Sequence, residues 1–334
     1  MDALYKDVVP FRVRSRVEGK KIYCGRKFHK GYDVVLGFND AFTFLKDIPR
    51  KTATLVVSSP HYNIGKSYEE QVEFNEYLEQ QRKVIEQCVY ILKPEGSICW
   101  EVGNYIKNGE VFPLDIFFYD IFKDLGLKLR NRIVWHFEHG LHSSKRFSGR
   151  YEIILWFTKG ENYVFNLDAV RVPQKYPGKL AYKGPSKGKP SGNPRGKNPS
   201  DVWKVILEDW EREIWNIPNV KHNHPEKTNH SAQFPIELPE RLILALTREG
   251  DVVLDPFVGV GSSIVAAILH GRKGIGVDKE KTFIEVAYQR IKAAFEGTLR
   301  RRPLGKPIYQ PSGTEKVAKI PPEWEMRNLN ESAQ

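Results

Sequence analysis

Short apolar runs alternate along the chain with stretches in which apolar residues recur at helical spacing. Residues 251–278 show this alternation most fully. The run Val252-Val-Leu254 ends in Asp255 and a glycine turn, a stretch with helical spacing follows, and a second apolar run ends at Asp278. A strand, a loop, a helix and a second strand in this order predict half of a nucleotide-binding α/β unit.

The same alternation extends over most of the chain. Buried-looking apolar and β-branched runs predict strands, and apolar residues on one helical face predict helices. We expect a strand or turn at 32–36, strands at 52–59, 97–102, 127–137 and 151–158, and helices at 41–48, 74–92, 113–122, 237–248 and 281–295. Residues 1–30 are basic and irregular, and the tail from Arg300 onward is expected to be poorly ordered. This succession predicts an α/β fold.

The glycine turn indicates which ligand the unit binds. Gly259 and Gly261 let the backbone close on a ligand at a helix N-terminus, and an acid about 20 residues downstream, here Asp278, can hold ribose hydroxyls. Ile264 occupies the third glycine position of the dinucleotide pattern, and Asp255 would repel a pyrophosphate. S-adenosylmethionine carries an ammonium, a sulfonium and a ribose, and so fits better. A glycine turn that only packs a helix on a strand stays open at this point.

Composition and charge narrow the class of protein. The 334 residues can bury a full core, and 52 Lys and Arg against 41 Asp and Glu give a net charge of +11. Such a balance suits a polyanionic partner, although many basic proteins bind none. Cys24, Cys88 and Cys99 lack metal or disulfide spacing, which favours a reducing compartment. The chain shows no signal peptide and no membrane-spanning run, so we expect a soluble cytoplasmic protein associated with the nucleoid.

Residues 171–204 have a different composition. Nine Lys and Arg stand there against the single acid Asp201, with Tyr176, Tyr182 and Trp203 interleaved. A disordered linker has such a composition. So does a surface that reads nucleic acid, because cations bind phosphates and planar groups contact bases.

A second motif follows the predicted strand 52–59. Ser59-Pro60-His61-Tyr62 lies at the carboxyl end of that strand, where open α/β sheets bind ligands. Together with Asp255-Pro256-Phe257-Val-Gly259-Val-Gly261-Ser262 it resembles the DNA amino-methyltransferase pattern, in which a Ser-Pro-Pro-Tyr or Asp-Pro-Pro-Tyr turn accompanies an Asp-Pro-Phe-x-Gly-x-Gly loop. The catalytic turn comes first and the basic segment separates the two motifs. This order resembles the β group of the family, found in bacterial and archaeal restriction-modification systems, over residues 33–292.

The resemblance implies a fold and a division of the chain. The expected fold is a doubly wound, mostly parallel, seven-stranded Rossmann-like methyltransferase sheet, circularly permuted, with a basic target-recognition insertion. Residues 1–160 would form the catalytic half and 229–298 the cofactor-binding half. Residues 161–228 would recognise the target sequence, and 299–334 would form a C-terminal tail.

The resemblance also implies the site residues. The catalytic turn would be Ser59, Pro60, His61 and Tyr62. The cofactor, S-adenosylmethionine, would be bound by Asp40, His230, Ser231, Phe234, Asp255, Pro256, Phe257, Gly259, Gly261, Ser262, Ser263 and Asp278. A turn or helix-cap role is the alternative for each polar residue, and Ser262 could act only as an N-cap.

The catalytic turn suits methylation of an amine. Ser59 Oγ and the Pro60 carbonyl can accept the hydrogens of an exocyclic amine and turn its lone pair toward the methyl group. The base must leave the duplex, and Tyr62 would stack on it. By resemblance, Ser at the first position favours N4 of cytosine over N6 of adenine. His61 replaces the usual second proline and leaves that assignment open.

Other chemistries fit less well. Cytosine C5 methylation needs a nucleophilic cysteine, and no Pro-Cys pair is present; a zinc deaminase needs a Pro-Cys-x-x-Cys segment to accompany His136-Phe-Glu138. His222, His224 and His230 suggest a polar loop more than a metal site, so no metal is expected. Double-stranded DNA is the expected partner. A catalytically inactive DNA-binding relative, methylation of RNA or protein, a homodimer and a separately encoded restriction endonuclease stay open.

Overall fold

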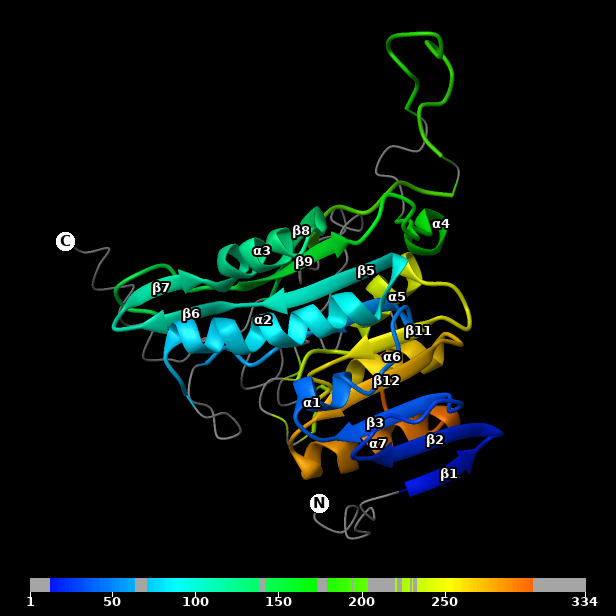
Figure 1. The fold of residues 1–334 in the computed structure, drawn as a ribbon. Coiled ribbons are helices and arrows are strands. Elements are labelled where there is room, and N and C mark those ends of the chain that lie inside the picture. The colour runs from blue at the N-terminus through cyan, green and yellow to red at the C-terminus, as the bar shows by residue number, and fades with distance from the viewer. Residues whose placement is uncertain are drawn as a thin grey trace, which may run out of the picture.

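The computed structural model describes residues 13–63, 71–137, 142–172, 179–193, 195–203, 220, 224–228, 230 and 233–302. A large twisted sheet runs through these residues, with helices on both sides (Figure 1). Its strands are β1 (Val13–Val17), β2 (Lys20–Gly25), β3 (Val34–Phe38), β4 (Ala53–Ser58), β5 (Leu92–Val102), β8 (Lys128–His136), β9 (Tyr151–Thr158), β10 (Val202–Trp203), β11 (Val252–Asp255) and β12 (Lys273–Asp278). A separate hairpin pairs β6 (Asn104–Lys107) with β7 (Glu110–Pro113).

The strand order is β1-β2-β3-β12-β11-β4-β5-β9-β8-β10. Strand β9 runs antiparallel to β5 and β8, β1 runs antiparallel to β2, and the other neighbouring pairs are parallel. The expected mostly parallel α/β sheet is therefore confirmed. The expected number of seven strands is wrong, because β1 and β2 extend one edge and β10 extends the other. Strands β4 and β11 are direct neighbours, with Leu55 opposite Val253.

Helices cover both faces of the sheet, as expected of a doubly wound fold (Figure 1). One face carries α1 (Ala41–Leu45), α2 (Phe74–Ile91) and α3 (Leu114–Asp124), which bury Phe44, Ile85 and Phe118 against it. The other carries α5 (Glu237–Leu246), α6 (Ser262–Leu269) and α7 (Lys281–Phe295), which bury residues such as Leu242 and Ile264. Among the helices of the described residues, none combines the length and hydrophobicity needed to span a bilayer.

Both chain ends differ from expectation. Residues 13–25, expected to be irregular, form β1 and β2. The first residues of the expected tail are fixed, because the buried Arg302 side chain forms an ion pair with Glu237 and its backbone N–H donates to Glu226 Oε1 at 3.1 Å. The rest of that tail lies outside the described residues.

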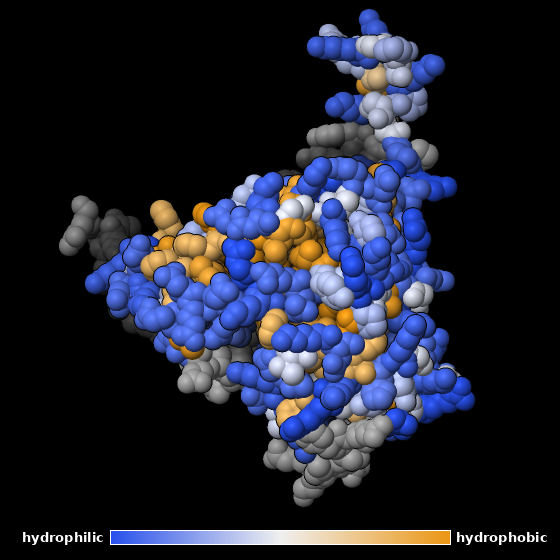
Figure 2. All heavy atoms as spheres, viewed as in Figure 1, coloured by the Kyte–Doolittle hydropathy of each residue, from blue (hydrophilic) through white to orange (hydrophobic). Residues whose placement is uncertain are grey.

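Part of the basic insertion stands away from the body. After β9 the chain forms the short helix α4 (Leu167–Val170), and residues 179–193 then project from the sheet (Figure 1). The projection is largely hydrophilic (Figure 2). Leu180 and Pro190 pair across its base, so this stretch adopts a defined conformation.

The cysteines belong to the core. Cys24, Cys88 and Cys99 are all buried and unpaired. Burial raises the pKa of the Cys24 thiol to about 12 and raises those of Cys88 and Cys99 further. A neutral thiol is a poor nucleophile, so these side chains fill space in the core.

Candidate active site

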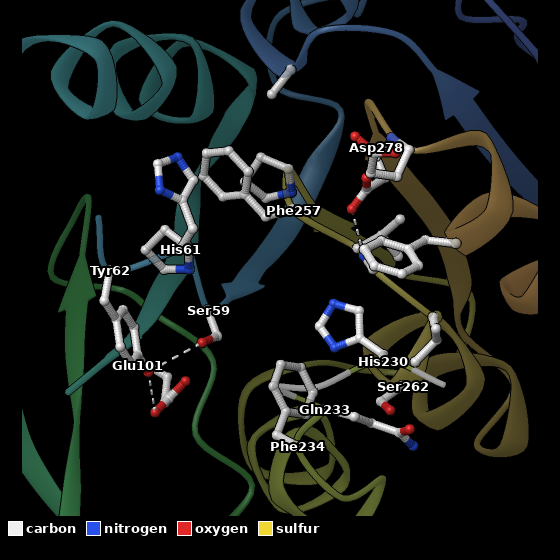
Figure 3. Close-up of a pocket in the computed structure, with 18 of the residues that line it drawn as sticks. Ser59, His61, Tyr62, Glu101, His230, Gln233, Phe234, Phe257, Ser262 and Asp278 are labelled. Carbon is white, nitrogen blue, oxygen red and sulfur yellow. Dashed lines mark hydrogen bonds between the residues drawn. The ribbon is translucent and has the colours of Figure 1, made fainter. Parts of the chain in front are cut away.

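A cavity of about 650 Å³ opens at the carboxyl edge of the parallel strands (Figure 3). Strands β3, β4, β5, β11 and β12 run in one direction, so the residues that follow them gather at the same edge. Asp40 follows β3 and Ser59 follows β4, whereas Glu101 is the second-last residue of β5 and Asp278 is the last residue of β12. All four side chains line the cavity.

Most of the predicted site residues meet in this cavity. Its lining includes Asp40, Ser59, Pro60, His61, Tyr62, His230, Phe234, Pro256, Phe257, Gly259, Ser262 and Asp278. Asp255, Gly261 and Ser263 do not line it. Ser231 lies outside the described residues. The turn after β4 and the glycine loop after β11 therefore share one site, although much of the chain separates them.

Asp255 lies beneath the glycine loop and does not face the cavity. Its Oδ1 accepts hydrogen bonds from Ser58 Oγ at 2.5 Å and from the Phe257 N–H at 3.0 Å, and its Oδ2 accepts one from Ser263 Oγ. Burial raises the pKa of the carboxyl group to about 6, although these hydrogen bonds oppose the shift. The expectation that Asp255 attracts a cationic cofactor directly is not met, since the residue ties β4, β11 and α6 together.

The start of α6 also differs from expectation. Gly261 is its N-cap residue, with φ of 82°, and no side chain caps the helix there. Ser262 is therefore not the N-cap. Its Oγ accepts a hydrogen bond from Arg290 Nη1 at 3.1 Å, and the same nitrogen donates to the Val260 carbonyl at 2.6 Å. Arg290 thus fixes the glycine loop from α7.

One half of the cavity is built around Asp278. Its Oδ2 accepts a hydrogen bond from the Gly259 N–H at 3.0 Å and its Oδ1 accepts one from the Glu280 N–H at 2.8 Å. Burial raises the pKa of this carboxyl to about 6. His230 lies beside Phe283, with ring centroids 4.4 Å apart, and a Cβ added to Gly259 would come within 3.3 Å of His230 Nε2. The histidine therefore packs closely over the bare glycine backbone.

The other half is built around Ser59. The Tyr62 hydroxyl donates to Glu101 Oε1 at 3.0 Å and lies 3.4 Å from Ser59 Oγ (Figure 3). Burial, followed by the charges of Glu101 and Glu152, raises the pKa of Tyr62 well above its usual value. The Tyr77 hydroxyl donates to the His61 carbonyl at 2.7 Å and fixes the turn from α2. The result is a chain of polar groups from Ser59 to Glu101.

Sequence reasoning missed several residues of the lining. The missed residues include Glu101, Trp135, Phe137, Glu152 and Gln233. The sequence could have identified Glu101, because an acid near the end of a predicted strand is the signal that identified Asp278. The sequence could not have identified Trp135 and Glu152, since the antiparallel register of β8 and β9 places them opposite each other.

The lining is acidic within a basic chain. Among the described residues it contains the carboxyl groups of Asp40, Glu101, Glu152, Asp278 and Glu280, against two lysines at positions 83 and 279. In the same part of the chain, no group of three His, Cys, Asp or Glu is placed to hold a metal ion; His222, one of the three histidines considered from the sequence, lies outside it. The cavity therefore favours an organic cation over a phosphate-rich ligand.

Comparison with known proteins agrees with this geometry. A family profile described as DNA methylase, covering N6 and N4 methyltransferases, matches residues 53–289. The chain belongs to the DNA methylase family. The resemblance to DNA amino-methyltransferases is thereby confirmed, and the matched residues include both halves of the cavity.

Individual methylases and related structures are also similar. The chain is 47% identical to the type II methyltransferase M.BglII of Bacillus subtilis over 75% of this chain and 66% of that one, just under two thirds of its length. It is 32% identical to the DNA adenine methyltransferase YhdJ of Escherichia coli over 76% of this chain and 81% of the relative.

Two solved structures share the fold. PvuII DNA methyltransferase, which is cytosine-N4-specific, has a TM-score of 0.58 at 19% identity, covering 79% and 92% of the two chains. TTHA0409 of Thermus thermophilus, complexed with S-adenosyl-L-methionine, has a TM-score of 0.53 at 24% identity, covering 78% and 96%.

Proposed function

We propose that this chain transfers a methyl group from S-adenosylmethionine to the exocyclic N4 amine of a cytosine flipped out of double-stranded DNA. The observation that carries the proposal is the single cavity that joins Ser59 to the Gly259 loop and Asp278. Residues 161–228 would recognise the target sequence through those of them that lie nearest the cavity. The modification would protect DNA from a separately encoded restriction enzyme.

The residues around Asp278 fit the cofactor. Each oxygen of the Asp278 carboxylate accepts one backbone hydrogen bond and keeps a lone pair for a ribose hydroxyl. The acidic lining suits the ammonium and sulfonium charges, and this charge comes from the cavity walls and not from Asp255. The S-adenosylmethionine complex of TTHA0409, a protein of the same fold, supports the choice of cofactor.

The residues around Ser59 fit the base. When bound, the cofactor supplies an electrophilic methyl group. Ser59 Oγ and the Pro60 carbonyl accept the two amine hydrogens and hold the nitrogen lone pair toward that methyl. The nitrogen would form the new N–C bond as the S–C bond breaks, the sulfur would keep the electron pair as a neutral thioether, and the nitrogen would release one proton to water. Tyr62 offers its ring for stacking, and Glu101 holds the hydroxyl of that ring.

Adenine N6 is the second candidate target. The serine at position 59 favours cytosine by resemblance, and the cytosine-N4-specific PvuII enzyme shares the fold. The 32% identity with the adenine methyltransferase YhdJ favours adenine. Both bases present an amine beside a ring nitrogen acceptor, so the same polar groups serve either reaction.

The test is transfer of tritiated methyl from S-adenosylmethionine to duplex DNA, followed by sequencing of DNA methylated in cells that express this chain. Wild-type protein should label DNA at one sequence and one base. Ser59→Ala should remove most of the turnover and keep cofactor binding, measured by calorimetry. DNA binding with no transfer to any duplex would refute the proposal and favour a relative that only binds nucleic acid.

A further inference from the structure

The loop 142–150 lies at the edge of the sheet where the cavity opens. It precedes β9 at the edge where β4 and β5 end, because β9 runs antiparallel to β5 and so begins at that edge. Its base is closed by a hydrogen bond from the Phe137 N–H to the Arg150 carbonyl at 2.8 Å. Trp135, Phe137 and Glu152, on the two strands that carry the loop, line the cavity. The loop therefore begins and ends beside residues of the proposed base-binding half.

The loop presents one aromatic ring among cations. Phe147 is 98% exposed, and Lys145 and Arg146 precede it, both exposed. The turn is braced from inside, since the Ser143 N–H donates to Ser148 Oγ at 3.1 Å. An isolated exposed hydrophobic residue needs no explanation by itself. An exposed ring beside two cations, at the sheet edge where this cavity opens, has the features of a wedge that enters nucleic acid.

We propose that Phe147 enters the DNA helix at the position that the target base leaves, and that Lys145 and Arg146 bind the phosphates beside it. This inference rests on the proposed function. A flipped base leaves two neighbours unstacked, and the enzyme must supply the free energy of that opening. A phenyl ring placed between those neighbours restores part of the stacking, and the cations hold the backbone in the opened form. Phe147 is thus a positioning residue that favours the flipped state and does not touch the reacting atoms.

A second exposed aromatic residue provides a matched control. Tyr182 is 83% exposed and precedes Lys183, so its chemistry is close to that of Phe147. It lies on the projection 179–193, far from the cavity edge (Figure 1). Tyr182→Ala therefore removes an exposed ring beside a lysine at a place where the ring could not enter the helix next to the target base.

The experiment compares Phe147→Ala, Phe147→Trp and Tyr182→Ala with wild type on two duplexes that carry the sequence found by sequencing. In one duplex the target base is paired, and in the other it is mispaired, which lowers the cost of flipping. Single-turnover methyl transfer is measured on both. From the usual strength of base–aromatic stacking, Phe147→Ala should slow transfer to the paired duplex roughly 5- to 100-fold. On the mispaired duplex it should come within about twofold of wild type, if flipping is the step that it supports.

Each outcome decides the question. Phe147→Trp should keep wild-type rates on both duplexes, and Tyr182→Ala should leave the ratio between the two duplexes unchanged. Wild-type rates for Phe147→Ala on paired DNA, or an equal loss on both duplexes, would overturn the inference and leave the proposed function standing. No methyl transfer by the wild-type protein to either duplex would refute the proposed function and the inference with it.

Discussion

At the scale of single residues, the hydrogen bond between Tyr62 and Glu101 provides a direct test of the catalytic half. Glu101→Ala removes the acceptor that holds the Tyr62 hydroxyl, which lies 3.4 Å from Ser59 Oγ. Loss of a hydrogen bond to a charged group should slow methyl transfer about 10- to 100-fold. Glu101→Gln keeps an acceptor oxygen and should restore most of the rate in a single-turnover assay.

Tyr62→Phe distinguishes positioning from a direct role of Glu101. If Glu101 acts through the tyrosine, Tyr62→Phe reproduces the loss, and the double variant Tyr62→Phe with Glu101→Ala is no slower than either single variant. Losses that multiply in the double variant would mean that Glu101 contacts the substrate itself.

The buried carboxyl group of Asp255 predicts a pH dependence of stability. Its folded-state pKa of about 6 is raised above the ordinary value of 3.8, so the folded protein binds a proton more tightly than the unfolded chain does. This contribution to stability is full below the unfolded pKa and is lost as the pH rises through about 6. From about pH 5 to about pH 7.5, the free energy of unfolding should fall by about 1 kcal/mol more in wild type than in Asp255→Asn.

Urea denaturation of both proteins at the two pH values measures this difference. Asp278 also has a raised pKa and stays in the variant, so the comparison isolates most of the Asp255 contribution. Parallel pH profiles for the two proteins would show that the Asp255 carboxyl has an ordinary pKa.

The residues Asp255, Gly261 and Ser263 show where motif reasoning stops. The motif identifies which residue types occur, but the direction of each side chain depends on the neighbouring strand and helix. Asp255 accepts a hydrogen bond from Ser58. Nothing in the sequence indicated that Ser58 binds Asp255 while its neighbour Ser59 faces the cavity. That partner became visible only when β4 and β11 were found side by side.

At the scale of elements, a strong helical spacing of apolar residues predicted the first and last residues of helices accurately. The helix expected at 281–295 is α7, and the helix expected at 74–92 ends one residue earlier. Strand β5 begins at Leu92, not at 97, because the chain continues through Pro94 with a shift in register against β4. The hairpin of β6 and β7 was missed, although Asn108-Gly109, both with positive φ, is a known hairpin turn signal. Strands β1, β2 and β10 lie at the sheet edges, where one-sided burial leaves a weak pattern.

The packing of α7 on the start of α6 predicts unequal costs for two glycine substitutions. Gly261 and Gly271 both have positive φ, so alanine at either position strains the backbone by about 1 to 2 kcal/mol. At Gly261 the added Cβ would also meet the Ala287 Cβ at 2.9 Å, whereas at Gly271 its nearest neighbour is the Glu249 side chain at 3.6 Å. Gly261→Ala should therefore lose about 1 to 3 kcal/mol more stability than Gly271→Ala.

Chemical denaturation of the two variants measures that difference directly. Gly261→Ala should also weaken S-adenosylmethionine binding in calorimetry, because Arg290 on α7 holds the Val260 carbonyl of the same loop. Equal stability of the two variants would show that α7 moves aside at no cost.

At the scale of the whole molecule, the decisive feature is the adjacency of β4 and β11. The local pattern alone could not predict this adjacency, because a parallel neighbour can come from any part of the chain. The order of the two motifs predicted it, through the resemblance to a circularly permuted family. The placement of the basic insertion could not be predicted, since its composition fits a linker as well as a binding surface. Residues 179–193 carry four lysines and no acid and stand far from the cavity edge (Figure 1).

This distance predicts that the projection binds phosphates and does not read bases. Binding of wild type to DNA should weaken about 10³-fold or more between about 50 and 200 mM salt, as expected for 6 to 10 phosphate contacts. Replacing Lys179, Lys183, Lys187 and Lys189 with glutamine should lower the slope of log affinity against log salt by up to about 4 and weaken binding to all sequences alike. The methylated sequence should stay the same, because base contacts would come from residues nearer the cavity.

Fluorescence anisotropy over a salt series measures the slope, and sequencing of DNA from cells that express the variant identifies the site. An unchanged slope would place the projection off the DNA, and an altered site would make it a reader of sequence.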